Sequence, residues 1–386
     1  MGKKKSERGD DSSPGDRLFS GWKAGLCYHH GKGKESNGSG IEELEHLSSI
    51  DWNRDEHRMS VSAILVKGVY MLEDDRQARR QDSQCQAPPW WNLFNFELDK
   101  QLVDDDDSIF GAVFKYNPST YHSSIDRSPL YVIAFRGTLF KLKSYRRDIK
   151  LDIKIIRNGL HETSRFKTAM KAVQDVVSLA GVSNVWLTGH SLGASIAILA
   201  GKEMAKIGNF MDSFTFNPPF VSPPIEGIKS KKVKQGLRYI GTSIKVGVSI
   251  AAAAAAAAAN DGHNNSFAAM SGWIPRLFVN RSDPICAEYI GYFEHRRKLE
   301  DKGAGCVARE TSQYSLTMKA VGKKDIERRE PLHLLPSASL TVNSDPCPDC
   351  NSAHSLRKLK CLAAHHALAQ WWRPDLNLSS DVYKYQ

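Results

Sequence analysis

The chain of 386 residues carries a formal net charge of +10 and has a hydrophobic content of 41%. This length suits one large α/β domain or two smaller ones, and the low hydrophobic content implies that part of the chain is tail or loop. The basic residues are spread out and accompany no nucleic-acid-binding motif, so we expect a solvated basic surface and no nucleic-acid partner. No uninterrupted run of about eighteen strongly apolar residues occurs, so no transmembrane helix is expected.

Residues 1–45 are rich in Lys, Ser and Gly, which predicts a disordered basic tail ahead of a single folded domain over residues 46–386. The start Met1-Gly2-Lys3 fits the bare myristoylation pattern, but a lysine directly after the glycine favours a plain solvated tail. Seven scattered cysteines without a secretory signal favour free thiols and a cytoplasmic location over a disulfide framework.

The first half of the domain predicts a helix, two strands and a second helix. Apolar spacing predicts the first helix over residues 57–75, and two apolar runs predict neighbouring strands over residues 109–116 and 131–136. A capped helix follows over about residues 164–180. Residues 88–91 read Pro-Pro-Trp-Trp, a rigid aromatic loop that we interpret as a packed cover rather than part of an acyl-binding rim.

Residues 184–195 form the stretch around which the chain is organised. They read as a buried strand, a one-residue pivot at Ser191 and a helix running to about Lys206. Gly189 and Gly193 stand two residues before and after the serine, where larger side chains would collide with neighbouring elements. This pattern predicts a nucleophile elbow, in which the helix N-terminus points its amides towards developing negative charge.

A serine hydroxyl becomes an effective nucleophile when a histidine removes its proton and a carboxylate holds that histidine in the right tautomer. In α/β-hydrolases the order is Ser, then an acid at the end of a later strand, then His. Asp283 meets this description because it directly follows residues 276–280, the last core strand that we predict. The sequence pattern leaves the histidine open among His354, His365 and His366.

The oxyanion hole needs two backbone N–H groups. One is expected from Leu192, directly after the nucleophile, and the other from Thr138, in the loop after an earlier core strand. His190 is not expected to be the base, because its side chain leaves the elbow in another direction.

The predicted architecture is therefore an α/β-hydrolase fold with a central, mostly parallel sheet flanked by helices. A helical insertion over residues 225–272 follows the strand at residues 213–217, and it contains nine consecutive alanines over residues 251–259. Alanine is the best helix former but a weak hydrophobe, so we expect an exposed or loosely docked helix, with a lid or membrane-facing element as the alternative. The segment from Pro284 to about residue 341, after the strand at residues 276–280, is charged and is expected to be irregular.

Cys347, Cys350, His354 and Cys361 lie close together in the sequence, but their spacing matches no standard zinc motif. We therefore expect a reduced surface loop there, no metal site and no cofactor.

With these residues in view, the chain resembles the class 3 lipases, and more narrowly the plant class 3 lipase-like proteins often labelled GDSL esterase/lipase. The resemblance extends over about residues 50–386, and the chain lacks the Gly-Asp-Ser-Leu block of a true GDSL enzyme. The matching motifs are residues 87–91, 134–138, 189–194, 214–219, 278–283, 288–296 and 370–376.

The resemblance implies a soluble acyl-ester hydrolase and puts the histidine four residues ahead of Gln370, at His366. A doubled histidine and an apparent insertion around residues 356–361 keep His365 and His354 as alternative bases.

We therefore expect a carboxylic ester hydrolase that acts on lipid or small esters through Ser191, Asp283 and His366, with contact at the periphery of a membrane. The alternative is a lipase-like scaffold with little or no catalysis that acts in protein interaction or signalling.

Overall fold

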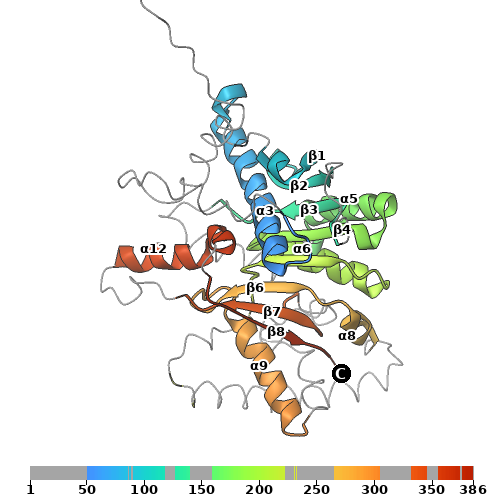
Figure 1. Ribbon diagram of the computed structural model, residues 1–386, viewed down its shortest axis with the longest axis vertical. Helices are drawn as coiled ribbons and strands as arrows, with labels where there is room; N and C mark the ends of the chain where they lie inside the picture. Colours follow the sequence, from blue (N-terminus) through green and yellow to red (C-terminus); the bar gives the residue numbers. More distant parts are fainter. Residues whose placement is uncertain are drawn as a thin grey trace, which may run out of the picture.

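The computed structural model describes residues 50–85, 87, 90–117, 127–139, 159–221, 230, 232, 265–304, 332–345, 355–373 and 376–385. Within these ranges eight strands form one sheet, in which the spatial order follows the sequence from β1 to β8 (Figure 1). The strands are β1 (Phe96–Val103), β2 (Ile109–Tyr116), β3 (Tyr131–Phe135), β4 (Val185–His190), β5 (Asp212–Phe216), β6 (Arg276–Asn280), β7 (Ala338–Asn343) and β8 (Leu378–Tyr383). Strands β3 to β7 run parallel, whereas β1, β2 and β8 are antiparallel to their neighbours, so the predicted mostly parallel sheet is confirmed.

Helices cover both faces of this sheet (Figure 1). The described α-helices are α3 (Asp55–Ala78), α5 (Ser164–Ala180), α6 (Leu192–Lys206), α8 (Asn265–Ala269), α9 (Glu288–Asp301) and α12 (Ser355–His366). Short 3-10 helices are η1 (Asp82–Gln84), η2 (Trp90–Phe94), η3 (Leu160–Glu162), η4 (Val182–Asn184), η6 (Met270–Gly272) and η7 (Leu368–Trp372). Helix α3 packs with η2 and η7 on one face, and α5, α6, α8 and α9 pack on the other.

The alternation of side chains along β3 shows how one strand serves both layers. Val132 and Ala134 belong to the apolar cluster beneath α3, while Ile133 and Phe135 belong to the cluster beneath α5 and α6. A strand covered on both faces is rich in apolar residues, which is why β3 reads as a continuous apolar run and β4 begins with one.

Several predicted elements are confirmed closely. Helix α5 begins after Thr163, whose hydroxyl accepts a hydrogen bond from the Phe166 N–H at 3.2 Å, and it is followed by Gly181 at φ 82°. Helix α3 is longer than predicted, and it is buried on almost every side between His57 and Met71 because it packs against the sheet and also contacts η7 and η2. Trp91, in the aromatic loop, is buried against Phe114, as expected for a packed cover.

The prediction that β6 is the last core strand is wrong, since β7 and β8 follow it in the sheet. The prediction of an irregular segment up to residue 341 is also wrong, because it contains α9 and most of β7. Helix α9 is rich in charge, yet Phe293 is fully buried and the Arg296 guanidinium lies over its ring at 5.1 Å. Such arginines cover apolar surface with their side chains, so a charged sequence hides a packed helix.

Other expectations fall outside the described ranges: the tail over residues 1–45, the alanines at 251–259, and Cys347 and Cys350. Cys361 is buried in α12 and disulfide-bonded, so the expectation of free thiols in a reduced surface loop is wrong at that residue, whereas Cys85 and Cys286 are free. Among the described residues no helix has both the length and the apolar character needed to cross a membrane.

Candidate active site

Ser191 lies at a strained turn between β4 and α6, with φ 54° and ψ −125°. A residue other than glycine rarely adopts this conformation, and here the serine N–H is anchored to the Phe216 carbonyl at 3.0 Å. A Cβ atom on Gly189 would lie 2.4 Å from the Gly193 oxygen, and one on Gly193 would lie 2.3 Å from the Phe135 oxygen. The structure therefore requires glycine on both sides of the serine, as the sequence pattern predicts.

The structure brings Ser191, His366 and Asp283 together. His366 ends α12, and its Nε2 lies 2.9 Å from the Ser191 Oγ while its Nδ1 lies 2.7 Å from the Asp283 Oδ2. Asp283 is in the turn after β6 and is fully buried, and the serine and histidine are each 2% exposed. Two side chains at the carboxyl ends of parallel strands thus meet a third from the C-terminal part of the chain.

The contacts around Asp283 favour its ionised form. Its Oδ1 accepts the Ile285 N–H at 3.0 Å, and its Oδ2 accepts the Asn217 amide at 2.7 Å and the Cys286 thiol at 3.3 Å. Burial alone would raise the pKa of Asp283, but the adjacent His366 and these donors outweigh it and lower the pKa. Burial and the neighbouring carboxylate raise the pKa of the Cys286 thiol well above its usual value, so it stays protonated and can donate.

The ionised Asp283 determines the tautomer of His366. An ionised carboxylate only accepts hydrogen bonds, so the His366 Nδ1 must carry the proton that it shares with Asp283. In the neutral imidazole the Nε2 then has a lone pair, which can accept the Ser191 hydroxyl proton. This arrangement can activate the serine as a nucleophile.

The two alternative bases are placed differently. His365 is the neighbour of His366, and its carbonyl accepts hydrogen bonds from Asn217 at 3.1 Å and from Gln370 at 2.7 Å. Burial lowers the pKa of its imidazole, although Asp283 acts in the opposite direction. It is the imidazole of His366, and not that of His365, that lies between Ser191 and Asp283. His354 lies outside the described residues.

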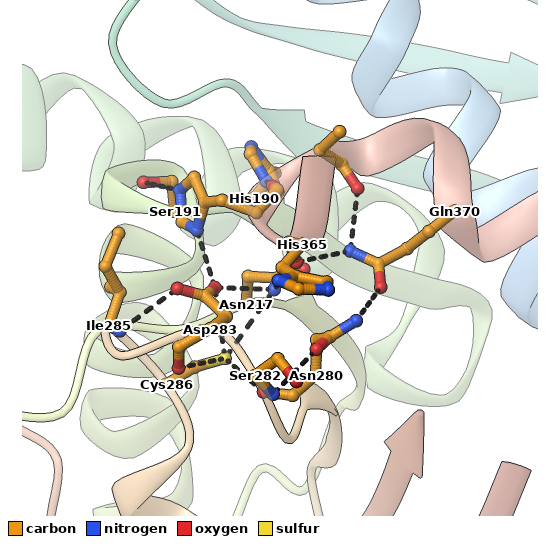
Figure 2. Close-up of polar contacts among 12 residues, drawn as sticks. His190, Ser191, Asn217, Asn280, Ser282, Asp283, Ile285, Cys286, His365 and Gln370 are labelled. Atoms are coloured by element: carbon orange, nitrogen blue, oxygen red, sulfur yellow. Dashed lines mark hydrogen bonds and ion pairs between the residues drawn. The ribbon is translucent and has the colours of Figure 1, made fainter. Parts of the chain in front are cut away.

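Asn217, directly after β5, joins the acid to the histidine segment (Figure 2). Its Nδ2 donates to the Asp283 carboxylate and to the His365 carbonyl, and its Oδ1 accepts the Trp371 indole N–H at 2.8 Å. The Trp371 ring packs against Phe278 with the ring centroids 5.7 Å apart. One side chain therefore couples the two candidate catalytic groups to the core.

Gln370 makes a second set of contacts with the same segment (Figure 2). Its Nε2 donates to the carbonyls of His365 and Ala367, at 2.7 Å and 2.8 Å. Its Oε1 accepts the side-chain amides of Asn280, at the end of β6, and Asn343, at the end of β7. The turn that carries the histidine is thus tied to two strand ends by one glutamine.

The loop over residues 136–139, after β3, lies directly beside the serine. A Cβ atom on Gly137 would lie 2.8 Å from the Ser191 Cβ, so the loop backbone touches the elbow. The Arg136 guanidinium donates to the Gly137 carbonyl at 2.7 Å and holds the loop from behind. Thr138 is the next residue of this loop, and Leu192 begins α6 directly after the serine.

Sequence reasoning did not single out three residues of this site: Tyr70, Asn217 and Cys286. Tyr70 bonds to His190, 120 residues away, and no local pattern identifies such a contact. The sequence does contain a signal that could have identified Asn217. A polar residue directly after a buried parallel strand lies at the edge of the sheet where ligands bind.

A parallel sheet with a strained serine between β4 and α6, followed along the chain by an aspartate after a later strand and then a histidine, defines the α/β-hydrolase class. Residues 132–223 match the class 3 lipase family. A protein from Arabidopsis thaliana named as a GDSL esterase/lipase is 44% identical over 352 residues, which cover 88% of this chain and 96% of the relative. The chain belongs to the class 3 lipase family, and the resemblance noted in its motifs is confirmed.

Proposed function

We propose that this protein is a serine carboxylester hydrolase that acts on lipid acyl esters. The observation that carries the proposal is the His366 imidazole, which lies 2.9 Å from the Ser191 Oγ and 2.7 Å from the Asp283 carboxylate. Membership of a lipase family and the name of the relative support an ester as the substrate. That this ester carries a lipid acyl group is a more specific proposal, which needs its own test.

In the proposed mechanism the Ser191 Oγ attacks the ester carbonyl carbon while its proton moves to the His366 Nε2. Asp283 stabilises the imidazolium that forms, through the hydrogen bond at the His366 Nδ1. The tetrahedral intermediate then expels the alcohol, which takes the proton from the Nε2. Water attacks the acyl-enzyme in the same way, releases the carboxylic acid and regenerates the serine.

The oxyanion of the tetrahedral intermediate needs donors on the side of the serine away from His366. The Leu192 N–H is in the first turn of α6, where backbone amides are not used inside the helix. The Gly137 N–H already donates to the Tyr70 hydroxyl at 2.8 Å. We therefore assign the second oxyanion donor to the N–H of the next residue, Thr138. Removing one such donor typically costs about 10²–10³ in kcat.

A fluorophosphonate probe tests the proposal directly, because it reacts only with an activated serine. We expect covalent labelling of the wild-type protein, none of Ser191→Ala, and loss of p-nitrophenyl ester hydrolysis in the same variant. Ser195→Ala is the matched control, since Ser195 is also a buried serine of this segment but lies one turn into α6. A wild-type protein that neither reacts with the probe nor hydrolyses any ester would favour the non-catalytic scaffold.

The substrate class needs a separate measurement. Hydrolysis of triacylglycerols, phospholipids, galactolipids and short soluble esters should be compared for the wild-type protein and Ser191→Ala, with fatty acid release as the readout. Turnover confined to short soluble esters would contradict the lipid part of the proposal and leave the esterase part intact.

A further inference from the structure

Three hydrogen bonds form a chain that links the loop after β3 to the histidine segment. The Gly137 N–H donates to the Tyr70 Oη at 2.8 Å. The Tyr70 Oη lies 2.8 Å from the His190 Nδ1, and the His190 Nε2 lies 2.8 Å from the carbonyl oxygen of His366. The chain therefore runs from the neighbour of Thr138 to the backbone of the residue whose imidazole contacts Ser191.

The donor and the acceptor of each hydrogen bond follow from the groups at the two ends, the His366 carbonyl oxygen and the Gly137 N–H. A carbonyl oxygen only accepts, so the His190 Nε2 must carry a proton and donate a hydrogen bond to the His366 carbonyl oxygen. The Nδ1 of a neutral His190 is then an acceptor, and the Tyr70 hydroxyl donates to it. The Tyr70 oxygen keeps lone pairs for the Gly137 N–H. His190 is thus in the opposite tautomer to His366, whose Nδ1 is protonated.

The groups in this chain of hydrogen bonds are closely packed. Tyr70 and His190 are 8% and 5% exposed. A Cβ atom on Gly137 would lie 2.7 Å from the Tyr70 Oη and 2.9 Å from the His190 carbonyl oxygen, so the loop cannot come closer. The rings of His190 and His366 lie with their centroids 4.9 Å apart. A shift of the tyrosine, the loop or the histidine would therefore displace the others.

We propose that Tyr70 and His190 are positioning residues for ester hydrolysis, which hold the Thr138 loop and the His366 backbone in one geometry relative to Ser191. The inference rests on the proposed function, because it concerns the same reaction. The hydrogen bond from His190 goes to the backbone of His366 and not to its imidazole. The effect of the two side chains arises from preorganisation, since a donor or base displaced by about 1 Å can cost about a hundredfold in rate.

The test compares kcat and KM for p-nitrophenyl butyrate in Tyr70→Phe, His190→Gln and the double variant. Phenylalanine removes only the hydroxyl. The glutamine Nε2 can replace the histidine Nε2 as the donor to the His366 carbonyl, but its Oε1 is then not at the position where the histidine Nδ1 accepts from Tyr70. Each single variant should lower kcat about tenfold to a hundredfold, with KM changed less than about threefold, because broken buried hydrogen bonds displace groups that act at the transition state. The double variant should be within about threefold of the worse single variant, because both substitutions break the same chain.

Tyr116→Phe is the matched control. Its hydroxyl also accepts a buried hydrogen bond, from the Trp52 indole at 3.2 Å. Tyr116 ends β2 beside the first residues of β3 and β4, however, whereas Ser191 follows the last residue of β4. This variant should keep the wild-type kcat. The inference is overturned if Tyr70→Phe matches Tyr116→Phe in kcat, or if the losses of the two single variants multiply in the double variant.

The outcomes separate the inference from the proposed function. Ser191→Ala assayed in parallel must be inactive; if it is active, the proposed function fails whatever Tyr70→Phe does. If Ser191→Ala is inactive and Tyr70→Phe has wild-type kcat, only the inference fails. If thermal unfolding shows that Tyr70→Phe does not fold, His190→Gln and His190→Asn decide. The shorter asparagine side chain does not place its amide at the position of the His190 Nε2, which donates to the His366 carbonyl, so its kcat should be the lower of the two. Equal kcat values in these two variants would overturn the inference.

Discussion

Replacing Asn217 tests how Asp283 and the histidine segment are held together. The Asn217 amide donates to Asp283 at 2.7 Å and to the His365 carbonyl at 3.1 Å, and it accepts from the Trp371 indole at 2.8 Å. Its backbone has φ 47°, a left-handed conformation in which a residue with an ordinary side chain is strained. Asn217→Gly therefore removes the amide and leaves the backbone relaxed, whereas Asn217→Ala removes the amide and adds strain.

The contacts with Asp283 and Trp371 dominate the expected loss of stability. The His365 carbonyl keeps its hydrogen bond from Gln370 at 2.7 Å, so it is not left unsatisfied. A hydrogen bond to a charged group contributes about 1.5–3 kcal/mol, and a buried N–H left without its partner, here that of Trp371, costs about 1–3 kcal/mol. We expect Asn217→Gly to lower the free energy of unfolding by about 3–5 kcal/mol, and Asn217→Ala by about 1–2 kcal/mol more.

The pH dependence of this loss identifies Asp283 as the partner. The pKa of Asp283 is lowered in the folded protein, so the stability that it contributes is complete above the unfolded pKa of about 3.9 and is lost as the pH falls through the folded pKa. Asn217→Gly removes one of the donors that lower this pKa. The stability difference from the wild type should therefore be largest near pH 7 and should narrow below about pH 4.

Urea unfolding followed by tryptophan fluorescence, at a series of pH values from 7 to 3, measures the loss of stability and its pH dependence. Hydrolysis of p-nitrophenyl butyrate measures the effect on kcat. We expect kcat of Asn217→Gly to fall about tenfold to a hundredfold, because the lost hydrogen bond to the carboxylate corresponds to about 1.5–3 kcal/mol. A stability difference below about 1 kcal/mol at pH 7, or one that stays constant down to pH 3, would refute the reasoning.

Two further predictions concern the other groups. His366→Ala should reduce hydrolysis as far as Ser191→Ala does, because members of a triad act as a unit. His365→Ala should keep most activity, because the contacts of His365 with Asn217 and Gln370 are made by its backbone carbonyl. The reverse ranking of the two histidine variants in kcat would assign the base to His365. Asp283→Asn should keep the histidine near its position but favour the wrong tautomer, with a loss of about 10⁴ in kcat by analogy with serine proteases; an unchanged rate would exclude Asp283 as the acid.

The elements around the elbow were predictable because their signals are local. An apolar strand, glycines two residues on either side of Ser191 and an alanine-rich helix lie within one short stretch, and the helix cap at Thr163 is read from its own neighbours. Strand β8 was missed because most of its residues are exposed, which leaves no apolar alternation to read. The histidine was selected only by the resemblance, because spacing alone left three candidates in the last part of the chain.

The contacts that hold the site were not predictable in the same way. Tyr70 lies in the middle of α3, where its apolar neighbours explain it as a core residue, and its bond to His190 spans 120 residues. Gln370 reaches Asn280, 90 residues earlier in the chain. Pairs this distant leave no periodic trace, since each partner satisfies the local pattern of its own element and the pairing exists only in the folded sheet.

The position of His366 depends on polar residues at the ends of four consecutive parallel strands. His190 ends β4 and contacts the His366 carbonyl, Asn217 follows β5 and contacts the His365 carbonyl, and Gln370 brings in β6 and β7 through two asparagine amides.

The carboxyl ends of parallel strands meet at one edge of the sheet, so these groups converge on the segment that carries the histidine. Apolar packing of Trp371 and Trp372 stabilises this segment but tolerates small shifts, because burial is non-directional. Hydrogen bonds are directional, and each buried polar group left unsatisfied costs about 1–3 kcal/mol, so a shift of the segment by one residue would break several at once. The polar strand ends therefore select His366 over its neighbour, and the tryptophans supply the stability that keeps it there.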